Sequence, residues 1–71
     1  MSWETTEFII YIINEIANSQ EKYPSHVYKV LQKTDCINNY LAPFYDILHT
    51  RSSQSVVEDV LEFIKMKGVS L

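Results

Sequence analysis

Glycine and cysteine are nearly absent from the 71-residue chain, which has one of each, Gly68 and Cys36. With one glycine, the chain lacks the glycine-rich loops by which P-loop enzymes and dinucleotide-binding proteins hold phosphates. With one cysteine, it forms no internal disulfide and no cysteine-rich zinc site. The two histidines, His26 and His49, do not have the i, i+4 spacing of a helical metal site. We therefore expect no metal and no cofactor.

Positive charge and long apolar runs are also scarce. Six lysine and arginine residues stand against nine aspartate and glutamate residues, for a formal net charge of −3, which disfavours nucleic acid as a partner. The longest apolar run, residues 8–13, is far shorter than the roughly 20 residues of a membrane span. Acidic rather than basic residues precede this run, unlike in a signal peptide. We therefore predict a cytoplasmic protein without a membrane segment.

Apolar side chains, by contrast, are plentiful. Hydrophobic residues make up 46% of the chain and aromatic residues 13%, a composition typical of folded rather than disordered proteins. A chain of this length has room for one small core, so we predict a single helical domain over residues 1–71.

The first apolar segment has the spacing of a helix. Large apolar side chains recur every four residues, at Phe8, Ile12 and Ile16. This pattern predicts a helix over residues 3–19, with Ser2 or Thr5 as its N-cap. The alternative is a β-strand over residues 8–13, which are rich in β-branched and aromatic side chains. We favour the helix because the repeat continues past this run without a turn signal.

Two helices are predicted in the middle of the chain. After a connector over residues 18–24, a short helix is predicted over residues 26–33 with Ser25 as its N-cap. A third helix is predicted over residues 41–49, after a start near Asn38 or Asn39, with Pro43 tolerated in its first turn.

The last helix has the clearest start. After a polar loop over residues 50–54, Ser55 and Glu58 match the S-x-x-E capping box, and Gly68 is suited to end the helix in a left-handed conformation. The four segments predict an all-α fold, a small bundle of about four short helices.

Asp46 and His49 are the residues that most resemble a catalytic pair. They lie three apart on the third predicted helix, where a carboxylate orients an imidazole for acid–base chemistry in some enzymes. We favour a structural interpretation, in which His49 contacts the carbonyl groups at the helix end. No nucleophile or oxyanion hole is evident, so we predict that the protein is not an enzyme and has no catalytic residues or small-molecule substrate.

A DNA-binding regulator is the alternative interpretation. The second and third predicted helices imitate a helix-turn-helix, with a basic face of His26, Lys29, Lys33 and Arg51. The recognition helix would be apolar and would lack side chains suited to reading bases, so a solvated basic face explains these residues better.

The aromatic residues favour protein binding. Nine large rings are many for so small a core, and aromatic side chains left at a surface are typical of interfaces. We therefore expect a protein partner or a homo-oligomer, with contacts from the first and third predicted helices.

Three sequence boxes carry a family resemblance. They read S-H-V-Y-K-V-L-Q-K over residues 25–33, F-Y-D-I-L-H-T over residues 44–50 and V-E-D-V-L-E-F-I over residues 57–64. With them the chain resembles short bacterial proteins grouped as a domain of unknown function, number 3791 in that series. Its boxes are similar to S-x-x-V-Y-x-L-F-x-K, Y-D-x-L-H-T and V-E-D-I-x-E-Y-I. The chain departs from the family pattern at Thr34-Asp35, where glycine is frequent, and at Pro43.

The resemblance implies a stand-alone helical protein without an assigned activity. Such proteins are often encoded beside an ADP-ribosyltransferase-like protein, which implies an antitoxin or an accessory partner. The family boxes supply the candidate interface residues Tyr45, Asp46, His49, Thr50, Glu58 and Asp59. Two roles for them stay open. Either they contact a partner protein and fix how it aligns on the surface, or they hold the third predicted helix against the fourth. In the second role, Tyr45 stacks on His49, and Asp46 accepts hydrogen bonds from the next helix.

Overall fold

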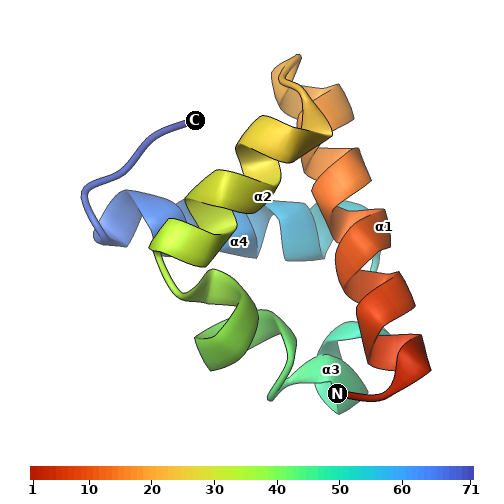
Figure 1. Cartoon of the computed structure of the whole chain (residues 1–71). Coiled ribbons are helices and arrows are strands. Elements are labelled where there is room, and N and C mark those ends of the chain that lie inside the picture. Colours follow the sequence, from red (N-terminus) through yellow and green to blue (C-terminus); the bar gives the residue numbers. More distant parts are fainter.

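Helices alone build the chain in the computed structural model, which describes residues 1–71 and confirms the predicted all-α class (Figure 1). The first helix, α1, spans Trp3–Gln20, so the helical interpretation of this segment is confirmed and the strand is wrong. Ser2 is its N-cap, because the hydroxyl oxygen accepts a hydrogen bond of 3.1 Å from the backbone N–H of Thr5. The face that α1 buries consists mainly of isoleucine: Ile9, Ile12, Ile13 and Ile16.

The end of α1 has a left-handed residue that is not glycine. Glu21 has φ 54° and ψ 47°, and its backbone N–H donates to the carbonyl oxygen of Ala17. A side chain in this conformation costs roughly 1 kcal/mol relative to glycine.

We expect Glu21→Gly to raise the free energy of unfolding by about 0.5–1 kcal/mol, because it removes this strain. Urea denaturation followed by circular dichroism measures the change. Asn18→Gly, inside the same helix, is the control and lowers the free energy of unfolding. A loss of stability in Glu21→Gly as well would contradict the left-handed helix end.

The second helix, α2, spans Pro24–Lys33 and begins two residues before the predicted start. The N-cap is Tyr23, without a side-chain hydrogen bond, so the prediction of Ser25 as the cap is wrong. Proline explains the earlier start, because its fixed φ suits the first helical position and its missing N–H would have no partner there. α2 packs against α1, and the two diverge from their connection toward the N-terminus of α1 (Figure 1).

The single helix predicted over residues 41–49 is wrong. The structure has a π-helical turn, η1, over Ile37–Leu41 and a one-turn helix, α3, over Tyr45–Leu48. Pro43 lies between them and explains the interruption, because it has no N–H to continue the backbone ladder. Asn38 and Asn39 lie inside η1 and do not cap a helix.

The last helix, α4, spans Ser53–Met66. Its N-cap is Ser52, whose hydroxyl oxygen accepts a hydrogen bond of 3.2 Å from the backbone N–H of Ser55. The capping box predicted at Ser55 and Glu58 is therefore wrong by three residues, since Ser55 is the residue that is capped. Gly68 has φ 77° and follows the helix in a left-handed conformation, as predicted.

One core joins all of these elements. α4 crosses behind α1 and α2 (Figure 1). Buried side chains from the five elements, together with Cys36, form a cluster of 15 residues. Its largest fully buried members are Ile12, Ile16, Leu31 and Leu41. None of the helices combines the length and the apolarity that crossing a membrane requires.

Candidate functional site

Tyr45 and His49 form a small aromatic cluster between α3 and α1. Their rings stack with centroids 4.6 Å apart and planes at 17°, which confirms the predicted stacking. The Nδ1–H of His49 donates to the carbonyl oxygen of Tyr45 at 2.8 Å, so the predicted helix-end contact is also present. On its other side Tyr45 meets Phe8 of α1 edge to face, with centroids 5.5 Å apart. These contacts attach α3 to α1.

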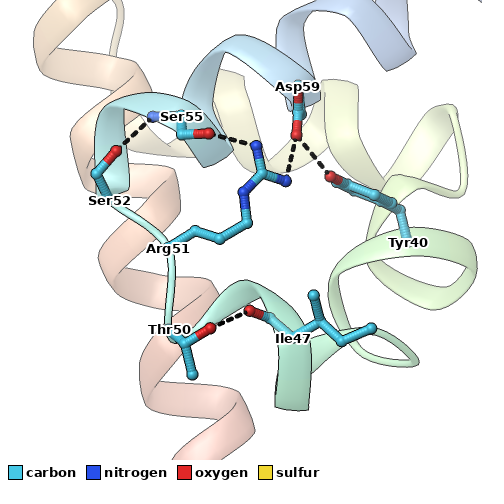
Figure 2. Close-up of polar contacts among 7 residues, drawn as sticks. All are labelled: Tyr40, Ile47, Thr50, Arg51, Ser52, Ser55 and Asp59. Atoms are coloured by element: carbon cyan, nitrogen blue, oxygen red, sulfur yellow. Dashed lines mark hydrogen bonds and ion pairs between the residues drawn. The ribbon is translucent and has the colours of Figure 1, made fainter.

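Asp46 takes no part in that attachment. Its side chain is exposed and makes no hydrogen bond or ion pair, so the prediction that it accepts hydrogen bonds from the next helix is wrong. Glu58 is exposed as well. Thr50 closes the end of α3 by donating from its hydroxyl to the carbonyl oxygen of Ile47 at 2.8 Å (Figure 2).

Asp59, on α4, makes polar contacts with two other segments. Figure 2 shows its carboxylate between Arg51 and Tyr40, which come from different segments. The guanidinium of Arg51 lies 2.6 Å from Oδ2 of Asp59, and the Tyr40 hydroxyl donates to the same oxygen at 3.2 Å. Arg51 also donates to the hydroxyl of Ser55. The network joins η1, the loop before α4 and α4 itself.

The electrostatics of this network are those of a structural contact. Partial burial, followed by the Asp59 carboxylate, raises the pKa of Tyr40 above its ordinary value, so the hydroxyl stays a proton donor. The hydrogen bond to Asp59 raises the pKa of Arg51 further. Both shifts keep the protons of Tyr40 and Arg51 in place as donors to the Asp59 carboxylate.

Cys36 is the one thiol, and it lies in the core. Its exposed fraction is zero. Burial raises its pKa from 9.0 to about 12, which keeps the thiol protonated and unreactive in the folded protein. His26, by contrast, is exposed and donates through Nε2 to the backbone oxygen of Leu71 at 3.2 Å. No group of three potential metal ligands comes together.

An open apolar cleft lies between α1 and the elements that follow it. Its volume is about 330 Å³. One wall comes from α1, and the other comes from α2 and η1, on the side where α1 and α2 diverge (Figure 1). Most of its lining is apolar, including Ile9, Ile10, Ile13, Tyr28 and Leu31. A second hollow of similar volume, about 320 Å³, lies at the other end of α1, between Gln20, α4 and the C-terminal residues.

Sequence reasoning did not find this cleft. Ile10 is half-exposed and lies beside the buried stripe of α1. This isoleucine, outside the repeat of buried residues, was the only sign of the cleft in the sequence. The predicted surplus of aromatic side chains at the surface is present, with Tyr28 on the cleft. The exposed rings are Trp3, Tyr11, Tyr23, Tyr28 and Phe44.

The candidate residues of the family boxes are thus not gathered in one place. Tyr45, His49 and Thr50 make contacts within or beside α3, and Asp59 joins the network of Arg51. None of the six lines the cleft. The box residues that make structural contacts therefore lie apart from the apolar cleft.

Comparison with known proteins gives one match. The model of the family described as "Protein of unknown function (DUF3791)" matches residues 7–67, which include all three sequence boxes and every residue that lines the cleft except Met1 and Thr6. No curated protein and no solved structure matches.

Proposed function

The chain belongs to the family described as "Protein of unknown function (DUF3791)", and we propose that it is a protein-interaction module that binds its partner in the cleft between α1 and α2. The role is binding rather than catalysis. The observation that carries the proposal is the apolar lining of the cleft, with Ile10 and Tyr28 at 50% and 46% exposure. Apolar side chains exposed around a concave surface are typical of protein-binding sites.

Details of the cleft support a protein rather than a small molecule as its occupant. Its volume of about 330 Å³ lies at the low end for small-molecule sites, which bury most of their ligand. Its walls are helix faces, and such grooves accept the apolar side of a partner's helix or loop. The ADP-ribosyltransferase-like neighbour implied by the family resemblance is the first partner to test. If binding silences that protein, the chain is an antitoxin; if activity persists, it is an accessory partner.

The DNA-binding alternative lacks a comparable observation. Its recognition helix was the helix predicted over residues 41–49, which is instead a π-helical turn and a separate turn of four residues. A helix-turn-helix needs a continuous recognition helix to enter the major groove.

Site-specific photo-crosslinking in living cells of the native host tests the proposal. A photoreactive amino acid replaces Ile10 at the cleft or, as a control, Met66, which is 80% exposed on α4 and does not line the cleft. We expect a protein adduct from position 10 that position 66 does not give. The captured protein, once purified, must then bind the isolated chain. Equal adducts from both positions, or none from position 10, would contradict the proposal.

A further inference from the structure

We propose that the cleft binds a basic amphipathic helix of another protein, an inference that rests on the function proposed above. Three features point to this occupant: the spacing of the apolar side chains, an unpaired carboxylate at the cleft and a glutamate on the adjoining surface of α1.

The apolar lining has the layout of a helix-binding groove. Ile9, Ile10 and Ile13 form a ridge along α1, and Tyr28 and Leu31 face it from α2 with a spacing of three. A helix that presents apolar residues at i, i+3, i+4 and i+7 inserts them between two such ridges. The groove is therefore matched to one stripe of apolar side chains, with the polar face of the bound helix turned to solvent.

Asp35 provides a negative charge among the side chains that line the cleft. It is the only charged side chain among the lining residues, and it makes no ion pair or side-chain hydrogen bond within the chain. It lies just after α2 with φ 59°, in a left-handed turn that fixes its place between α2 and η1. A lysine or arginine of the partner would form an ion pair with this carboxylate.

The α1 wall extends the acidic character outward. Trp3, Glu7 and Ile10 recur at i, i+4 and i+7, so they share one exposed stripe beside the cleft. The other glutamates of α1, Glu4 and Glu15, lie on the opposite side of the helix, where Glu15 accepts a hydrogen bond from Ser53 of α4. Basic residues flanking the apolar stripe of a bound helix therefore meet the carboxylate of Glu7 along this wall.

The same charges disfavour a second copy of this chain as the occupant. Two cleft faces brought together would place Glu7 and Asp35 of one copy near those of the other.

The probes are two synthetic amphipathic peptides of equal length and identical apolar stripe. One carries lysine and arginine at its polar positions and the other carries glutamate. Fluorescence anisotropy of the labelled peptides measures binding to the full chain. We expect the basic peptide to bind at least about tenfold more tightly than the acidic one at low salt, and added salt to reduce this difference.

Two substitutions at the cleft, with one control on α4, test whether the peptide binds in the cleft. Ile10→Lys changes a half-exposed residue, so the fold is retained, and we expect it to weaken binding of the basic peptide about tenfold or more. Met66→Lys makes a matched change on α4 and leaves binding unchanged. Asp35→Asn removes the carboxylate, and asparagine also adopts the left-handed conformation, so we expect a loss of about two- to fivefold without unfolding.

Each contrary result has a distinct meaning. Equal binding of both peptides, preference for the acidic one, or binding of neither overturns the basic helix. Sedimentation that shows a dimer disrupted by Ile10→Lys overturns it in favour of a second copy. In each case the crosslinking experiment decides the proposed function separately, because it does not depend on the charge or shape of the occupant.

Discussion

We expect Ile12→Ala to lower the free energy of unfolding by about 2–5 kcal/mol, the usual cost of truncating a fully buried isoleucine. Ile12 has no exposed surface and lies near the middle of α1, facing the core. A domain of this size has a total stability of roughly 4–11 kcal/mol. The substitution is therefore expected to remove a large part of the stability, and a clear shift of the urea midpoint measures it.

Ile10→Ala is the matched control, because it makes the same change two residues away on the same helix. Ile10 is 50% exposed at the cleft, and alanine has the better helix propensity, so the free energy of unfolding changes by less than about 1 kcal/mol. This pair also tests the helical periodicity. In a strand, residues 10 and 12 would lie on one face, and the two substitutions would then have similar effects.

The second large effect concerns the Y-D-x-L-H-T box. We expect Tyr45→Ala to lower the free energy of unfolding by about 1.5–3 kcal/mol, because it removes the edge contact with Phe8, the stacking on His49 and a partly buried ring. The thermal unfolding midpoint, followed by circular dichroism, measures the effect.

Asp46→Ala is the control within the same box. The Asp46 side chain is exposed and unpaired, so this substitution changes the free energy of unfolding by no more than about 0.5 kcal/mol. Equal stability of Tyr45→Ala and the parent chain would show that the aromatic cluster does not attach α3 to α1. A large loss of stability from Asp46→Ala would indicate that Asp46 makes a contact that the structure does not contain.

The helices that were predicted well have long, regular apolar patterns. α1 repeats its isoleucines over several turns, and local spacing alone determines which face is buried. The errors arose where one residue changes the local backbone. Pro24 moves the start of α2, Pro43 divides the third predicted helix, and Ser52 competes with Ser55 as the cap of α4. Several serines in a row offer several caps, and tertiary packing selects among them.

The interaction surface depends on geometry that local patterns do not contain. α1 has 18 residues and α2 has 10, so α1 is longer by about 12 Å at 1.5 Å per residue. The left-handed turn at Asp35 ends the course of α2 and leads into η1, which lines the cleft opposite α1. The cleft results from this difference in length and from the angle between the helices, and neither could be predicted from the spacing of apolar residues.

The polar network was unpredictable for a related reason. Tyr40, Arg51 and Asp59 come from three segments, and only the folded chain brings them to one carboxylate oxygen. The family boxes identified Asp59 but not its partners. The exposed aromatic side chains, in contrast, could be predicted from composition, because a small core does not cover so many rings.

Nuclear magnetic resonance mapping of the bound partner tests the central claim most directly. Backbone amide shifts of the isotope-labelled chain are recorded with and without the purified protein that position 10 captures. We predict that the largest changes fall on Ile9, Ile10, Ile13, Tyr28 and Leu31 and that α4 changes little. Changes concentrated on α3 or α4, with the cleft residues unaffected, would contradict the cleft as the binding surface.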